Sequence, residues 1–183
     1  MKNKVLSVLL VSALAVTNVI RKRLEIESYI KWPNDIVVNG RKVCGILTEM
    51  SSEVDYINHI VIGIGINANG ESFPEDIKDT ATSLFLAGGK KICRSELIAS
   101  IMKEFEEYYQ IFLETENLSK LMQKYNELLI NNNRTVRLFE QKKETIGTAL
   151  GINEMGELLI ETEGKVRNIM SGEVSVRGIY GYV

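Results

Sequence analysis

The sequence has 183 residues, of which 45% are hydrophobic and 25% are charged. This composition is typical of a globular protein and excludes intrinsically disordered and collagen-like chains. The 22 basic and 24 acidic side chains leave a formal net charge of −2, which offers no electrostatic case for nucleic-acid binding.

The N-terminal segment is compatible with three different structures. Lys2 and Lys4 precede an apolar stretch over residues 5–16 that ends in small residues, which is the layout of a secretory signal peptide. A membrane span is less favoured, because the apolar stretch over residues 5–20 is short and contains polar side chains. Its apolar residues also recur at helical spacing ahead of the basic residues 21–23, as in a core helix. The pattern alone leaves the signal peptide and the core helix open.

The next segment predicts a β-hairpin. Two strand-like runs, residues 36–38 and 41–48, are joined by Asn39-Gly40, the dipeptide that best tolerates the positive φ angles of a type I′ turn. Cys44 lies inside the second run and is interpreted as a small buried hydrophobe. It is distant in sequence from Cys93, so we expect two reduced thiols and no structural zinc site.

A second apolar run, over residues 60–66, shows no polar alternation. We therefore expect a central strand that is buried on both faces. Gly63 and Gly65 recur with a period of two, so both project to one face, where another element or a ligand can approach the backbone. Asn67 follows directly and could either contact the edge of a base or make an ordinary strand-end turn.

The second half of the chain changes period twice. Apolar residues at helical spacing predict core helices over residues 97–112 and 118–129. After three asparagines, the pattern becomes one of short strands between glycines, which can bury their faces only by curling into a small barrel. These predicted strands cover residues 135–139, 145–152, 158–161, 166–170 and 174–177.

The polar segment that stands out is Lys-Trp-Pro-Asn-Asp, residues 31–35. Pro33 cannot donate to a strand ladder, so the strand ends there or becomes an edge. One interpretation is a charged turn that Trp32 anchors in the core. The other is functional: the ammonium of Lys31, beside a glycine-lined face, could neutralise a carboxylate or a phosphate. The sequence shows no Ser-His-Asp triad, Walker loop or metal-binding cluster.

Together with its neighbours, this segment resembles biotin protein ligases in order and spacing. The matching strings are KWPNDI (31–36), GRKVCGILTE (40–49), VIGIGIN (61–67) and GEVSVRG (172–178). The resemblance implies an α+β fold, in which a class II synthetase-like mixed sheet with helices precedes a small SH3-like β-barrel. It also implies a partial catalytic domain over residues 1–132 and a C-terminal domain over residues 133–183. Lipoate ligases and octanoyltransferases share this fold and remain an alternative.

The implied activity is a two-step ligation with biotin and ATP, accompanied by Mg²⁺, as substrates. Biotinyl-5′-adenylate forms first, and a lysine of a biotin carboxyl-carrier protein then takes the biotin. Carried over by motif, Lys31 is the catalytic cation and contacts biotin. The other residues that the resemblance implies are Gly45, Ile46, Gly63 and Gly65 for biotin and Asn34, Asp35, Asn67 and Arg177 for the nucleotide.

The sequence also departs from the family. It contains no arginine-rich Gly-Arg-Gly-Arg-type loop. It also contains no N-terminal helix-turn-helix, so we expect no DNA partner. The order of the matching strings favours a core helix at the N-terminus over a signal peptide. We therefore expect a cytoplasmic protein without a membrane partner. Two classes of function remain: a ligase, alone or completed by a separately encoded N-terminal half, and a catalytically incompetent remnant that acts as a dimerising or binding module. A homodimer is compatible with both.

Overall fold

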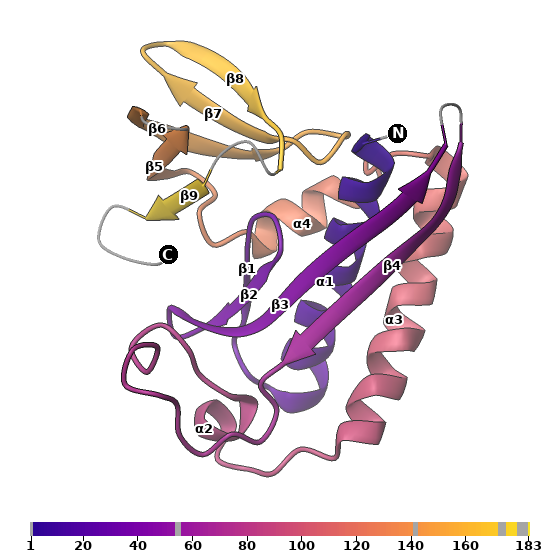
Figure 1. Ribbon diagram of the computed structural model, residues 1–183, viewed down its shortest axis with the longest axis vertical. Coiled ribbons are helices and arrows are strands. Elements are labelled where there is room, and N and C mark those ends of the chain that lie inside the picture. The colour runs from indigo at the N-terminus through magenta and orange to yellow at the C-terminus, as the bar shows by residue number, and fades with distance from the viewer. Residues whose placement is uncertain (1, 54–55, 141–142, 172–174, 179–182) are drawn as a thin grey trace.

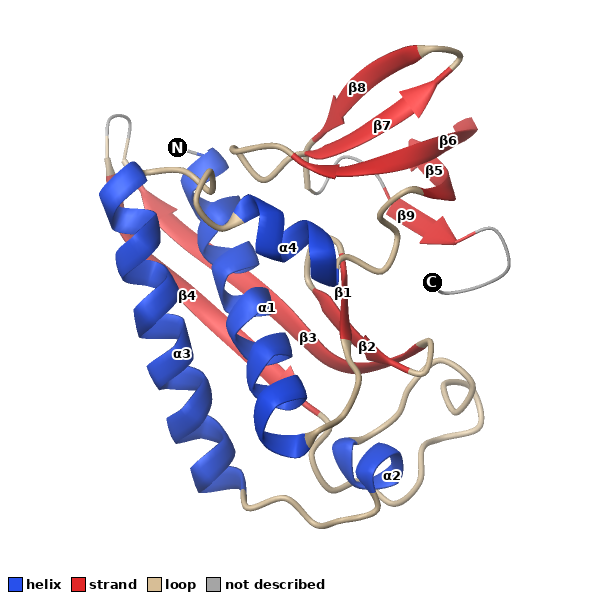
Figure 2. Cartoon of the chain, turned by 180° about the vertical axis from the view of Figure 1, so that it is seen from behind, coloured by secondary structure: helices blue, strands red, loops and turns tan. Residues whose placement is uncertain are grey.

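In the N-terminal part of the molecule, helices cover one face of a four-stranded antiparallel sheet (Figures 1 and 2). The computed structural model describes residues 2–53, 56–140, 143–171, 175–178 and 183. Two long helices, α1 (Lys2–Leu24) and α3 (Arg94–Thr115), lie side by side on that face. The strands follow one another in the sheet in chain order: β1 (Tyr29–Lys31), β2 (Asp35–Val38), β3 (Arg41–Ser52) and β4 (Ile57–Ile66).

Helix α1 is the central element of the core. Leu10, Ala13, Leu14 and Val16 are each at most 1% exposed, because α1 packs between the sheet and α3. Its segment Lys4–Leu24 is long and apolar enough to cross a membrane, yet most of that segment is buried inside the fold. The prediction of a core helix is confirmed.

The predicted hairpin is also confirmed. Val38 lies opposite Arg41, and both turn residues have positive φ, 51° at Asn39 and 74° at Gly40. Short connections of this kind force consecutive strands to run antiparallel. All pairings between the described strands are antiparallel, and the parallel pairs found among the described residues are two isolated bridges, Ile30 with Leu129 and Lys42 with Ala81. The α+β class is confirmed, and the two described sheets are antiparallel where a mixed sheet was expected.

The prediction of a doubly buried central strand is wrong. Among the described strands, β4 is the edge of its sheet, and only one of its faces meets the helices. Its isoleucines at 60, 62, 64 and 66 are half-buried on that face, whereas Val61 on the other face is 54% exposed. Two of the open-face positions are Gly63 and Gly65, and glycines do not interrupt an apolar run as charged residues would.

The C-terminal half confirms the predicted order of helices and strands. The predicted helix over residues 118–129 is the shorter α4 (Met122–Leu128), with Leu118 and Leu121 buried just before it. A further short helix, α2 (Leu84–Gly88), precedes α3 and was not predicted. Five antiparallel strands then form a second sheet, in the order β8-β7-β6-β5-β9. Closure of this sheet into a barrel stays a prediction, and residues 172–174 of the predicted last strand lie outside the described residues. The strands are β5 (Arg134–Glu140), β6 (Lys143–Ile152), β7 (Leu158–Thr162), β8 (Lys165–Ile169) and β9 (Ser175–Gly178).

Hydrogen bonds join β6 and the β6–β7 connection to Trp32 and to the region of α4. Trp32 is 3% exposed, and its indole N–H donates to the Gly156 carbonyl at 3.0 Å. On α4, the Asn126 side-chain oxygen accepts from the Ile152 amide at 2.8 Å. The amide of Leu118 donates to the Glu154 carbonyl at 2.8 Å. Trp32 is thus the predicted hydrophobic anchor of its turn, and it also links the two sheets.

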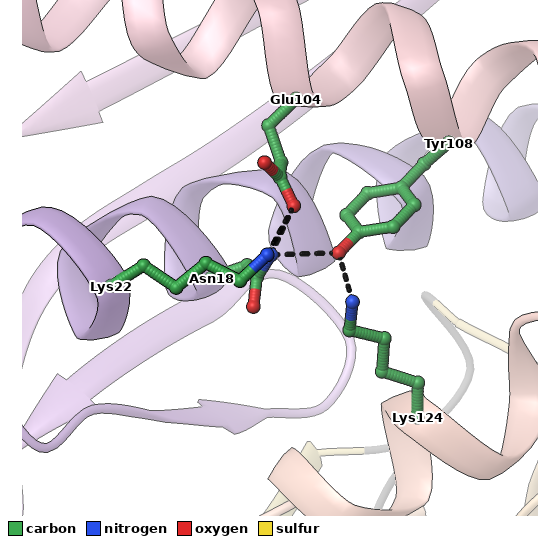
Figure 3. Close-up of polar contacts among 5 residues, drawn as sticks. All are labelled: Asn18, Lys22, Glu104, Tyr108 and Lys124. Carbon is green, nitrogen blue, oxygen red and sulfur yellow. Dashed lines mark hydrogen bonds and ion pairs between the residues drawn. The ribbon is translucent and has the colours of Figure 1, made fainter.

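A polar cluster connects the three helices α1, α3 and α4 (Figure 3). The Asn18 amide donates to the Tyr108 hydroxyl at 2.8 Å and also to Glu104. The Lys124 ammonium donates to the same hydroxyl and lies 4.6 Å from the centre of the Tyr108 ring. Burial works to raise the pKa of Glu104, but hydrogen bonds from Tyr108 and Asn18 and the charge of Lys22 bring it below its usual value. The cluster satisfies polar groups that would otherwise be buried without partners.

We expect Tyr108→Phe to lower the free energy of unfolding by about 1–3 kcal/mol, because Asn18 and Lys124 lose a common acceptor in a buried place. Urea denaturation measures the change. Tyr109→Phe is the matched control, since Tyr109 is half-buried and only ring stacking with Phe105 and Phe112 is found for it in the described part of the chain. Equal losses in the two variants would contradict this role of the cluster.

Candidate functional site

Four of the predicted site residues lie in one row across the first sheet. Lys31 on β1 is opposite Asp35 on β2, Asp35 is opposite Gly45 on β3, and Gly45 is opposite Gly65 on β4. Directly opposed residues of neighbouring strands project to the same face of a sheet. The row lies on the face that α1 and α3 leave open. It therefore combines a cation, a carboxylate and a backbone floor without side chains.

A β-bulge adds a second cation, Lys42, to this row. Lys42 is opposite Val37 and Cys44 is opposite Ile36, so β3 carries one extra residue between these two pairs. Such a residue inverts the alternation of side chains and re-aims those beyond it. The Lys42 ammonium lies 2.6 Å from Asp35 Oδ1, and a Cβ on Gly45 would lie 2.9 Å from it. Lys42 could not be predicted as a site residue from the sequence, because strict alternation would place its side chain on the opposite face from Gly45.

A cavity of about 290 Å³ opens over the two glycines. One wall is the segment between β4 and α2, which backbone hydrogen bonds fix to β3: the Lys42 amide donates to Thr80 at 2.7 Å, and Thr82 donates to Lys42 at 2.9 Å. The residues that line the cavity are Lys42, Cys44, Gly45, Gly65, Asn67, Phe73, Ile77, Thr80 and Ala81. Three predicted site residues, Gly45, Gly65 and Asn67, thus share one cavity.

The amide of Asn67 has a structural partner. Its Nδ2 donates to the Thr82 carbonyl at 3.1 Å, which holds the wall segment against the end of β4. This is the strand-end role that the sequence left open beside a contact with a base. Phe73 and Ile77, which line the same cavity, were not identified, because isolated apolar residues in a polar segment carry no periodic signal.

Asn34 and Ile46 fix the loop that follows Lys31. The Asn34 Nδ2 donates to the Ile46 carbonyl at 3.0 Å, and the Ile46 amide donates to the Asn34 carbonyl at 2.8 Å. The Ile46 side chain is 1% exposed and packs in the core, on the opposite face from Gly45. The structure therefore does not bring this side chain to the cavity. Gly63 shares the face of Gly65 but lies outside the cavity lining.

The electrostatics link Lys31 to the second sheet. Burial lowers the pKa of the Lys31 ammonium, and the positive charges of Lys42 and Arg177 lower it further, while Asp35 opposes them. Arg177 belongs to β9, so a cation of the C-terminal sheet acts on the end of β1. The cluster holds three cations and one carboxylate, which suits a ligand that carries several negative charges.

The cysteines contribute no reactive group to this site. Both are free thiols, as predicted. Cys44 lies behind the glycine floor, and burial raises the pKa of its thiol to about 12, which keeps the thiol protonated at neutral pH. In the described part of the chain, no three His, Cys, Asp or Glu side chains are grouped to hold a metal ion.

A larger cavity, of about 670 Å³, lies between the end of α1 and the start of α3. None of the site residues that the sequence predicts line this cavity. Its three basic side chains are matched by three acidic ones, Glu25, Glu27 and Glu96, so its charges balance and favour no ligand of one sign. The smaller cavity over the glycine row is the better candidate.

Comparison with known proteins identifies two family segments. Residues 1–67 match the biotin/lipoate A/B protein ligase family, and residues 133–177 match the biotin protein ligase C-terminal domain. The name of the first family includes lipoate ligases, whereas the name of the second domain gives biotin protein ligases alone. Together they favour biotin over the lipoate alternative.

Individual relatives agree with this assignment. The bifunctional ligase/repressor BirA of Bacillus spizizenii is 38% identical over 91% of this chain and 52% of its own length, and BirA of Escherichia coli is 32% identical over 92% and 52%. The chain thus spans about half the length of these curated relatives. The apo biotin protein ligase of Aquifex aeolicus superposes with a TM-score of 0.85 at 32% identity, over 96% of this chain and 76% of that one. The same ligase in complex with biotin and ATP gives a TM-score of 0.82 over 94% and 72%. This chain belongs to the biotin protein ligase family.

Proposed function

We propose that this chain provides one side of the active site of a biotin–protein ligase. The reaction joins biotin to ATP as biotinyl-5′-adenylate, releases pyrophosphate, and then transfers biotin to a lysine of a biotin carboxyl-carrier protein. The observation that carries this proposal is the row of Lys31, Asp35, Gly45 and Gly65, with Lys42 lying over it at the cavity. The Aquifex aeolicus relative, which was crystallised with biotin and ATP, supports the choice of substrates.

The glycine floor and the two lysines have separate tasks in this proposal. Gly45 and Gly65 leave the backbone open, so the fused rings of biotin can lie against the sheet. Lys42 and Lys31 face the point where the biotin carboxylate meets the α-phosphate, and their charges stabilise the negative charge that builds there during adenylation. Asp35 holds the Lys42 ammonium over the floor through its ion pair. Both lysines thus act as electrostatic catalysts and not as nucleophiles.

The nucleotide extends from this point toward Asn67 and the second sheet. We assign Asn67 to the adenine side and Arg177 to the phosphates, together with the loop that Asn34 and Asp35 shape. Mg²⁺ enters as part of the ATP substrate, since this ion is usually bound through the phosphates of a nucleotide. Ile46 and Gly63 support the floor from behind and beside it, and do not line the cavity.

The wider organisation is part of the same proposal. We assign residues 1–132 to the catalytic domain and residues 133–183 to an SH3-like barrel, in a cytoplasmic protein that has no membrane partner. A homodimer and a separately encoded N-terminal half remain part of the proposal. The names of two relatives join a ligase with a repressor, so they do not support the expectation that DNA is absent from the partners.

The first test is Lys42→Gln in an active preparation that contains this chain. We expect adenylation, measured as pyrophosphate release, to fall by about a hundredfold or more, because a cation at the developing charge is lost. The melting temperature should change little. Lys120→Gln is the control, since Lys120 forms an exposed ion pair with Glu114. Equal activity of the two variants would support the catalytically incompetent alternative or another site.

The second test is Gly65→Val, which places a side chain in the cavity over the two glycines. A Cβ at this position meets its nearest neighbour, the Gly45 carbonyl oxygen, at an ordinary contact distance of 3.7 Å, so we expect the fold to be retained. Calorimetric titration with biotin should show at least about a tenfold loss of affinity, because added methyl groups occupy the cavity. Val61→Thr changes the same face of β4 away from the cavity and should bind like the wild type. Unchanged binding by Gly65→Val would place biotin elsewhere.

The third test is the pH dependence of adenylation. The pKa of Lys31 lies below its usual value of 10.5, so its charge is lost as pH rises through this lower value. We therefore expect the rate to fall on the alkaline side before pH 10.5, and Lys31→Arg, which stays protonated, to shift this decline to higher pH. Identical profiles for wild type and variant would exclude Lys31 as the titrating cation.

A further inference from the structure

Two guanidinium groups of the second sheet lie over one aromatic ring. Arg137 on β5 is directly opposite Arg177 on β9, and Phe139 lies two residues beyond Arg137. The centre of the Phe139 ring is 5.6 Å from the Arg137 guanidinium carbon and 5.3 Å from that of Arg177. Both distances are within the range of a cation–π interaction, which fixes the position of a guanidinium relative to the ring.

The two arginines differ in their other partners. Like charges that face each other across a strand pair repel. The Arg137 guanidinium lies 3.8 Å from a carboxylate oxygen of Glu144, which offsets its charge. The ion pairs found among the described residues do not include Arg177. The Phe139 ring is therefore the contact that directs Arg177, while Arg137 is held on the side of Glu144.

Arg177 is also the residue through which the second sheet acts on the candidate site. It is exposed, and its charge is felt by Lys31 at the end of β1. An exposed arginine has many rotamers, and ordering it at the moment of binding would cost conformational entropy. A ring that holds the guanidinium beforehand lowers this cost.

We propose that Phe139 is a positioning residue, whose ring holds the Arg177 guanidinium toward Lys31 so that it can bind the phosphates of the nucleotide. This inference rests on the proposed function of the site and assigns to β5 a part in it. Phe139 itself does not touch the substrate. Its effect belongs to nucleotide binding and not to the chemical step, since it acts only through the placement of Arg177.

The kinetic test compares Phe139→Leu with Phe139→Tyr, which retains the aromatic face. We expect Phe139→Leu to raise KM for ATP about two- to fivefold, the range of an exposed cation–π contact, with kcat and KM for biotin unchanged. Phe139→Tyr should restore the wild-type value. In an Arg177→Gln background, Phe139→Leu should have no further effect on KM for ATP. A similar rise in both backgrounds, or a failure of Phe139→Tyr to restore binding, would overturn the proposal.

A second measurement does not depend on ligase activity. NMR titration of the Lys31 side chain reports the charge of Arg177, which lowers the Lys31 pKa. Burial is the main cause of the lowered Lys31 pKa and the Arg177 charge contributes least, so Phe139→Leu, which frees Arg177, should raise this pKa by a small, measurable amount. Phe139→Tyr should leave it unchanged. An unchanged pKa in Phe139→Leu would contradict the positioning role whatever the enzyme does. If the pKa moves but the wild type binds neither ATP nor biotin, the proposed function fails and the placement of Arg177 stands.

Discussion

The ion pair between Lys42 and Asp35 organises the open face of the first sheet. An ammonium and a carboxylate 2.6 Å apart lie beside a floor of two glycines, and the ammonium is the charged group of the cavity lining. The pair exists because a bulge re-aims Lys42 and because the strand register places Asp35 opposite Gly45. Lys42 lies close to the hairpin turn in the sequence, but the bulge is what directs its side chain toward the cavity.

The rest of the architecture makes this open face possible. Helices α1 and α3 cover the other face of the sheet, so the apolar side chains of β3 and β4 have a core on one side only. The polar cluster around Tyr108 holds α4 to these helices, and α4 in turn bonds to the second sheet through Asn126. The hydrophobic core that stabilises the sheet lies on its other face, so the site needs no side chains that pack over it.

Much of the fold could be predicted from the sequence, because its signals are local. Helical spacing identified α1 and α3, and Asn39-Gly40 identified the hairpin turn. The site was predictable in part: motif positions gave Lys31, Gly45 and Gly65, which one sheet row unites. Lys42 was missed because a bulge inverts the alternation of side chains and has no signature in composition. The Ile46 side chain lies in the core because it is adjacent to Gly45 in a regular part of β3, where alternation places the two residues on opposite faces. The edge position of β4 was not predicted, because its exposed face carries glycines at positions where charged residues would have indicated exposure.

The two sheets contribute to the site by different physical means. The first supplies fixed groups, since Lys31 and Lys42 start from paired strands and Asp35 holds Lys42 in place. The second supplies Arg177 from β9, and its placement depends on how the two sheets are joined. Trp32, the residue after Lys31, is one of the residues that make this joint, because its buried indole donates to the Gly156 carbonyl. The segment that ends β1 thus has two tasks, to present a cation and to fasten the sheet that provides another, and a substitution at Trp32 would disturb both at once.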